Sequence, residues 1–456
     1  MFSNEYIREY KSNLKIAYPV ALSQLGHIAV GIADSVMVGA LGGEPLASVT
    51  IAFSVMIPFM MLGIGISYGI SPLIAKADGE SNPREVASVF KNSLLLNMGA
   101  GILIALLLYV SSPLLRNLNQ PEQVVEMAIP FFELLAISMV PLMFFQTYRQ
   151  FAEGLAITRQ AMYISISGNL LNILLNYLLI PGRFGFPALG VEGAGYATLI
   201  SRIYMGLAMF AFIMYSPRFK KYRNLDQVVY SLKKVGRLFK MSIPVGIQLG
   251  LESGAFGFAA IMIGWLGVAD EIAAHHIALN MAAVSYMAAT GIAAAGSVRV
   301  GNEFGKGDYT KLRIAGLSAF HIVILFMGAC AITFVLLRDY LPHLYIQDVK
   351  IESLTSSLLL ICAFFQLSDG IQVVGLGALR GIGDVKIPTA IALISYWLIG
   401  IPIGYVFAFA YGLGTEGVWY GLFLGLLVAA CALFIRFHIK SKDLLSEGLN
   451  KLKTVE

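Results

Sequence analysis

Four polar residues in otherwise apolar stretches have the oxygen ligands that a small cation needs. Asp34 is the only charged residue between positions 16 and 43. Asn172 and Asn176 lie four residues apart in a second apolar run, and Thr198 lies in a third. Carboxylate, amide and hydroxyl oxygens are hard ligands of the kind that Na⁺ prefers, and a carboxylate also binds a proton. The sequence therefore predicts a Na⁺ or H⁺ site at Asp34, Asn172, Asn176 and Thr198.

The carboxylate decides between two interpretations of these residues. Asparagines inside a membrane commonly form hydrogen bonds between helices, and alone they would be explained in that way. A carboxylate near the middle of a membrane helix costs on the order of 2.5 kcal/mol or more, so it is rarely there without a function. With Asp34 beside the amides, a binding site is the better interpretation.

Two further acids, Glu252 and Asp369, lie in the second half of the chain. Each is the only charged residue in a long apolar stretch. An ionised carboxylate is not tolerated alone in hydrocarbon, so it must be protonated, bind a cation or face water. A carboxylate that alternates between these states can couple ion binding to transport. We therefore predict a second cation-coupling site at Glu252 and Asp369.

The elements that position these residues are long apolar runs. Hydrophobic residues make up 57% of the 456 and charged residues 13%, about half the share in soluble proteins. About twelve runs are long enough to cross a bilayer as helices: 16–39, 46–75, 92–115, 127–148, 161–181, 189–216, 241–267, 272–298, 314–337, 354–379, 387–411 and 416–435. A membrane barrel would instead show short alternating segments. The predicted fold class is an all-α polytopic membrane protein.

Positive charges indicate the orientation of the chain. The N-terminus, the even-numbered connections and the C-terminus hold 27 of the 32 Lys and Arg residues. By the positive-inside rule, both termini are expected in the cytoplasm. This distribution accounts for the net charge of +5 without any nucleic-acid partner. Arg202 is the one basic residue expected inside a helix, and Glu153 is expected near a helix end, where water solvates it.

An internal repeat divides the chain into two lobes of six helices. Leu189–Tyr196 recurs as Leu413–Tyr420 after 224 positions, and Ser71 with Gly79 recurs as Ser297 with Gly305 after 226. Six helices per copy give both copies the same orientation, which is a parallel repeat typical of transporters. We expect an N-lobe at 1–216, a basic cytoplasmic linker at 217–240, a C-lobe at 241–436 and a cytoplasmic tail at 437–456.

Three segments of the sequence occur together in one known family. They are Pro19 with Ile32–Gly39, Ala273–Asn280, and Ser368–Val374 followed by Leu379-Arg380-Gly381. In this order they resemble the MATE (multidrug and toxic compound extrusion) family, specifically its NorM-type branch, over essentially the whole chain. The resemblance implies an antiporter that exports mostly cationic, amphipathic organic compounds in exchange for Na⁺ or H⁺ by alternating access.

The resemblance also implies roles for individual residues. Asp34, Asn172, Asn176 and Thr198 match the N-lobe cation site of the family. Glu252 and Asp369 match the C-lobe acids of the NorM branch, and Tyr286 matches an aromatic position near the cation. Some relatives carry Tyr four residues before the C-lobe acid, whereas this chain has Phe365, which lacks the hydroxyl.

Other functions receive less support. A lipid-linked precursor flippase of the same superfamily is the main alternative, but it would need several basic residues in its cavity. An enzyme would need a paired nucleophile or a metal cluster, and the Gly-x-Gly-Asp sequence at 381–384 lies in a basic connection. A channel is harder to exclude. We expect no cofactor other than the coupling ion, a monomer in a bacterial inner membrane, and small-molecule drugs as partners.

Overall fold

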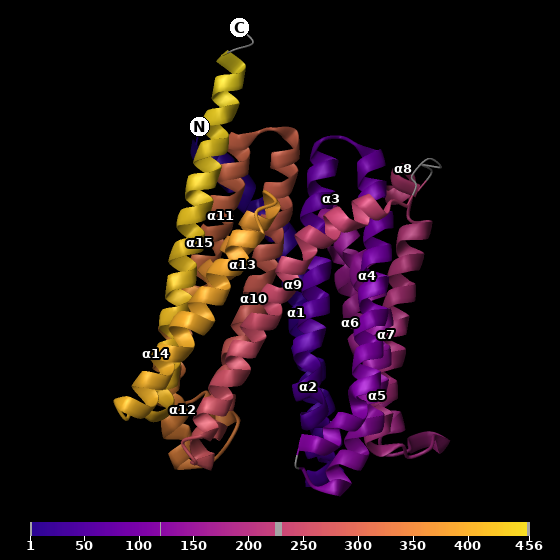
Figure 1. Ribbon diagram of the computed structural model, residues 1–456, viewed down its shortest axis with the longest axis vertical. Helices are drawn as coiled ribbons and strands as arrows, with labels where there is room; N and C mark the ends of the chain where they lie inside the picture. The colour runs from indigo at the N-terminus through magenta and orange to yellow at the C-terminus, as the bar shows by residue number, and fades with distance from the viewer. Residues whose placement is uncertain (1, 119, 224–229, 454–456) are drawn as a thin grey trace. The chain divides into compact units, whose positions relative to one another are not determined.

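The computed structural model describes residues 2–118, 120–223 and 230–453, and the regular elements of these residues are all helices (Figure 1). The longer elements are α1 (Phe2–Gly39), α2 (Gly43–Tyr68), α3 (Ile70–Gly79), α4 (Pro83–Ser111), α5 (Glu122–Gly154), α6 (Arg159–Leu179), α7 (Gly190–Tyr215), α9 (Leu232–Gly264), α10 (Ala269–Lys306), α11 (Tyr309–Leu337), α12 (Val349–Gly381), α13 (Lys386–Leu393) and α15 (Gly414–Lys453). Short elements are η1 (Ser112–Leu118), η2 (Arg183–Gly185), η3 (Pro217–Phe219), α8 (Lys220–Arg223), η4 (Pro342–Leu344), η5 (Ile394–Gly400), α14 (Ile401–Tyr405) and η6 (Val406–Ala410).

Twelve helical segments in the described residues are long and apolar enough to cross a membrane, which confirms the predicted fold class. Several helices are longer than their apolar runs. The first begins at Phe2 instead of position 16, and the last continues to Lys453 through the expected tail. The hydrogen bonds of a helix join residues four positions apart, so a helix can continue into water beyond the hydrocarbon. Hydropathy does not predict this part of the helix, because its residues are polar.

Contacts between residues divide the chain into two units. The N-unit comprises Leu22–Asp78 and Asn82–Gly250, and the C-unit comprises Met1–Ala21, Gly79–Ser81 and Leu251–Glu456. The boundaries therefore fall within α1, within α9 and on either side of Gly79–Ser81, not in the 217–240 connection, of which residues 224–229 lie outside the described part. Both helices contain a proline shortly before the boundary, Pro19 and Pro244.

One helix forms the centre of each unit. In the N-unit, α5 packs against α2, α4 and α7, and in the C-unit, α12 packs against α10, α11 and α15. Apolar side chains of α5 such as Phe131, Phe132 and Met139 are almost completely buried. The two central helices therefore provide rigid surfaces on which polar residues of the outer helices can be held.

The two central helices are related by the repeat. Each has 33 residues and ends at a glycine that meets a neighbouring backbone. A Cβ on Gly154 would lie 2.7 Å from the carbonyl oxygen of Ser71, and one on Gly381 would lie 2.8 Å from that of Ser297. The same pair of contacts thus occurs in both units, at positions that the sequence repeat relates.

The eleventh membrane span, Lys386–Ala410, departs from a regular α-helix. Its segments η5 and η6 are π-helical and flank the short helix α14. Pro402 in α14 has no N–H to donate to the preceding turn, which favours a wider local winding. The π-helical turn of η5 contains Tyr396, a buried residue of the C-unit.

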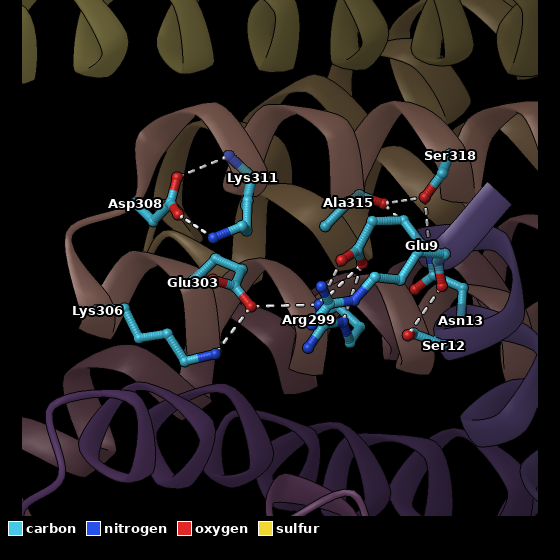
Figure 2. A network of polar contacts seen from close by, with 11 residues as sticks. Glu9, Ser12, Asn13, Arg299, Glu303, Lys306, Asp308, Lys311, Ala315 and Ser318 are labelled. Atoms are coloured by element: carbon cyan, nitrogen blue, oxygen red, sulfur yellow. Dashed lines mark hydrogen bonds and ion pairs between the residues drawn. The ribbon is translucent and has the colours of Figure 1, made fainter. Parts of the chain in front are cut away.

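The first turns of α1 are held in the C-unit by a network of polar contacts (Figure 2). Glu9 accepts hydrogen bonds from Arg299 on α10, with Oε1 2.7 Å from Nη2 and Oε2 3.1 Å from Nε. Arg299 also lies 3.2 Å from Glu303, which contacts Lys306 at 2.9 Å. Asn13 donates hydrogen bonds to the backbone and side chain of α11. Because Glu9 and Glu303 are buried, their two negative charges need the two positive charges of Arg299 and Lys306.

Two glycines allow helices to approach at backbone distance. A Cβ on Gly65 of α2 would lie 2.6 Å from the Cα of Gly246 on α9, within the N-unit. A Cβ on Gly291 of α10 would lie 2.7 Å from backbone atoms of Ala17 and Ala21 on α1, within the C-unit. The two glycines are 226 positions apart, so the repeat preserves this close contact.

We predict that Gly291→Ala destabilises the protein by about 1–3 kcal/mol, because its methyl group must displace the α1 backbone. Gly257→Ala is the matched control: nothing lies within 4 Å of its Cβ, and alanine favours a helix. Thermal unfolding of the purified variants in detergent measures both. Equal stability of the two variants would show that the contact at Gly291 is not tight.

Candidate functional site

The four predicted N-lobe residues lie together in the N-unit. Asp34 of α1 is 5% exposed and accepts a hydrogen bond from Nδ2 of Asn176 on α6. The same Nδ2 lies 3.2 Å from Oδ1 of Asn172, and Nδ2 of Asn172 lies 3.4 Å from Oγ1 of Thr198 on α7. Hydrogen bonds thus connect three helices through these four side chains.

The cluster has an oxygen that fits a cation. Oδ1 of Asn176 is buried and accepts no hydrogen bond from any described residue. An unsatisfied buried oxygen is costly, and a bound Na⁺ or water would satisfy it. Together with the Asp34 carboxylate, it supplies the hard oxygen ligands of a Na⁺ site. The use of this cluster by a cation remains a prediction.

Arg202 lies on the same face of α7 as Thr198, four residues further along. Its Nη1 donates a hydrogen bond of 2.7 Å to Oγ of Ser138 on α5, and its Nη2 contacts Sδ of Met60 on α2 at 3.5 Å. Both partners are neutral.

A second buried arginine, Arg149 of α5, corrects two sequence-based expectations. It is 1% exposed, and its Nε lies 2.6 Å from Oε1 of Glu153, which is 4% exposed. Arg202 is therefore not the one basic residue inside a helix, and water does not solvate Glu153. The apolar run ends at position 148 because the i, i+4 ion pair of Arg149 and Glu153 follows it, although α5 continues to Gly154.

The predicted C-lobe residues lie in the C-unit. Glu252 of α9 and Asp369 of α12 are 5% and 3% exposed, and each lies in the electrostatic field of the other. The hydroxyl of Tyr286 on α10 donates a hydrogen bond of 3.1 Å to Oε1 of Glu252. Three helices thus bring Glu252, Tyr286 and Asp369 together, and their role in coupling remains a prediction.

Two residues near these acids are absent from the sequence prediction. Tyr396 is 1% exposed, and its hydroxyl interacts with the carboxyl groups of both Glu252 and Asp369. Gln372 lies one turn after Asp369 on α12 and is fully buried, with both amide atoms lacking partners in the described chain. The sequence contains a signal for Gln372, because an amide is unusual within an apolar run. It contains none for Tyr396, which is one of 21 tyrosines.

Comparison with known proteins agrees with this fold. The MatE family model matches residues 19–178 and 244–406. The chain is 34% identical to "Probable multidrug resistance protein NorM" of Rhodopseudomonas palustris, over 98% of this chain and 95% of the relative. It is 29% identical to "Multidrug resistance protein MdtK" of Yersinia pseudotuberculosis, over 96% of this chain and 97% of the relative.

Solved structures share the same fold. The crystal structure of the eukaryotic MATE transporter AtDTX14 matches with a TM-score of 0.87 at 21% identity, covering 97% of this chain and 100% of that one. A multidrug resistance MATE family transporter in its outward-facing conformation matches with a TM-score of 0.89 at 23% identity, covering 96% and 97%. The fold is thus that of a polytopic membrane transporter. By sequence, the chain belongs to the MatE family.

We predict that Arg149→Met destabilises the protein by about 3–5 kcal/mol, because it leaves the buried Glu153 carboxylate uncompensated. The double variant Arg149→Met/Glu153→Met is expected to recover most of this loss, since it removes both charges. Arg116→Ala, at an exposed site in the same unit, is the control. Denaturation of purified protein measures all three, and strictly additive effects would contradict the ion pair.

Proposed function

We propose that the protein is a secondary active multidrug efflux antiporter, which exports organic cations in exchange for Na⁺ or H⁺. The observation that carries this proposal is the buried Asp34 carboxylate among Asn172, Asn176 and Thr198. A buried carboxylate with amide ligands changes its charge when a cation binds or leaves. The names of the relatives, which refer to multidrug resistance, support the class of substrate.

The coupling step follows from the two buried sites. A cation from outside neutralises Asp34, or one of the two carboxylates Glu252 and Asp369, and so removes a charge from the apolar interior. Binding drives the conformational cycle only if the ion binds the inward-open and outward-open states with different affinity. We propose that the ion-bound form favours release of the drug to the outside, with both termini in the cytoplasm of a bacterial cell.

The ion can be identified by transport in liposomes. Purified protein is reconstituted, and efflux of a fluorescent organic cation is followed under an imposed Na⁺ gradient and, separately, under a pH gradient. Ionophores that collapse each gradient are the controls. Transport driven by one gradient assigns the ion. Passive flux that neither gradient changes would instead indicate a channel and contradict antiport.

The flippase alternative is less favoured by the basic residues of the N-unit. A pyrophosphate group requires several available cations. Arg149 is already paired with Glu153, which leaves Arg202, bound to Ser138 and Met60, as a single buried cation rather than several. The same liposomes, loaded with a fluorescent lipid-linked pyrophosphate, test this alternative directly.

We predict that Asp34→Asn reduces ion-driven drug transport to the level of protein-free liposomes, because the amide has no negative charge for the coupling ion to neutralise. Glu44→Gln removes an exposed carboxylate of the same unit and is expected to leave transport unchanged. Gel filtration in detergent verifies that both variants are folded. Wild-type transport by folded Asp34→Asn would exclude Asp34 from coupling.

We predict that Tyr396→Phe weakens the apparent affinity for the coupling ion by roughly tenfold, the effect of losing one hydroxyl that can serve a charged group. In the C-unit the Tyr396 hydroxyl lies close to Glu252 and Asp369, whereas the side chain of Phe365 has no hydroxyl. Tyr411→Phe, at an exposed site, is the control. The ion concentration for half-maximal transport is the measurement, and an unchanged value would exclude a role for the Tyr396 hydroxyl.

A further inference from the structure

Two buried serines of the N-unit have hydroxyls without a protein partner. Ser23 of α1 is 1% exposed and Ser165 of α6 is fully buried, and neither Oγ forms a hydrogen bond with any described residue. Other buried serines of this unit, such as Ser93 and Ser201, donate to a carbonyl of their own helix. A buried hydroxyl without a protein partner is unusual and is commonly satisfied by water. The two serines therefore indicate water inside the N-unit.

The register of α1 and α6 places these two serines at one level. Asp34 contacts Asn176, and a Cβ on Gly26 would lie 2.6 Å from Nδ2 of Asn169. The two contacts follow each other in the same order along both helices, so α1 and α6 run parallel. In each helix the serine precedes the residue of the first contact by eleven positions. Both serines thus lie about 16 Å from the Asp34 cluster along the helix axes, at 1.5 Å per residue.

Asn169 lies between the two levels, on the face of α6 that carries the cluster. Positions 165, 169, 172 and 176 are three or four residues apart, which places them on one face of the helix. Asn169 is 8% exposed, and its Nδ2 forms no hydrogen bond with any described residue. Its amide lies against the α1 backbone because Gly26 has no side chain. Buried polar groups without protein partners thus continue from the cluster to the level of the two serines.

The line of polar groups ends beside a buried ion pair. Gln24 follows Ser23 in α1, and its Oε1 lies 3.5 Å from Nη1 of Arg149 on α5. Arg149 is paired with Glu153, so the two charges at this end balance each other. The groups without partners are two hydroxyls and one amide, which are neutral. With water they stabilise a passing cation through their dipoles, and they have no negative charge that would retain it.

We propose that Ser23, Ser165 and Asn169 line a buried, water-filled path for the coupling ion. The path connects the Asp34 cluster with the end of the N-unit at which Arg149 lies. This inference rests on the proposed ion coupling at Asp34. With the N-terminus in the cytoplasm, as proposed above, the Arg149 end is the cytoplasmic end. The path therefore serves to release an ion that has bound from outside.

Silver ion tests the path without any transport, because it is a monovalent cation similar in size to Na⁺ and it binds thiols tightly. The native cysteines Cys330, Cys362 and Cys431 are first replaced by alanine, and Ser23→Cys or Ser165→Cys is introduced. Purified protein is exposed to silver nitrate in chloride-free buffer, freed of excess silver, denatured and labelled with a maleimide. Silver is expected to abolish the labelling of both introduced cysteines.

Ser93→Cys of α4 is the matched control. Ser93 is fully buried, and its hydroxyl is bound by its own helix, so labelling at this position is expected to survive the silver treatment. Full labelling of both folded path variants after silver treatment would overturn the inference, and so would a loss at only one of the two. Equal loss in Ser93→Cys would also overturn it, because silver would then reach buried thiols in general.

Asn169→Leu tests the path if neither cysteine variant folds. It replaces an amide with an apolar side chain of similar size. The maximal rate of ion-driven transport is expected to fall by about tenfold, because the path loses one hydrogen-bonding group. The ion concentration for half-maximal transport is expected to stay the same. Ser167→Ala is the control, since the Ser167 hydroxyl donates to the carbonyl of Ile164 at 3.0 Å and lies outside the path.

Two results of this second measurement would contradict the path. They are a wild-type maximal rate in folded Asn169→Leu, and a change confined to the half-maximal ion concentration. Absence of ion-driven transport by the wild type would contradict the proposed function only, because silver labelling does not depend on transport.

Discussion

The hydrocarbon interior supplies no water, so every charge and every backbone group in a spanning helix must be satisfied by the protein itself. This constraint explains why the described residues are helical and why their buried charges occur in groups. Arg149 lies beside Glu153, and Arg299 lies between Glu9 and Glu303. These pairs contribute to structure because each buried charge is in direct contact with an opposite charge. Asp34 differs, since its direct partner is a neutral amide.

The two units meet this constraint in different ways although they share a scaffold. At the spacing of 225, Glu252 aligns with His27, and the position equivalent to Asp34 is Ala259, a buried residue of the apolar core. The N-unit has one acid with amides and a nearby arginine, whereas the C-unit has two acids with tyrosines. Duplication thus preserved the packing glycines, and the polar residues diverged. The two buried polar clusters therefore differ in charge although they occupy a shared scaffold.

The sequence predicts the spans well, because long apolar runs are a strong signal and their number does not depend on their edges. It also identifies Asp34, Glu252 and Asp369, since each is the only charge in its run. The sequence does not predict that Arg149 and Glu153 are buried. They follow the end of an apolar run and therefore resemble residues at the membrane surface. Tyr396 is missed because its importance depends on the π-helical turn of η5 and on the neighbouring helices, neither of which hydropathy records.

The polar network at the start of α1 has a consequence for biosynthesis. The N-unit ends at Gly250, so all its residues are available when little more than half of the chain has been made. The segment up to Ala21 belongs to the C-unit. Its residues Glu9 and Asn13 can form their contacts only after Arg299 and Ser318 have been synthesised. Since chains are made from the N-terminus and domains generally fold as units, this segment is synthesised before the N-unit but acquires its native contacts after it. Until then its charged and amide groups must remain in water, which the polar sequence before Ile16 permits.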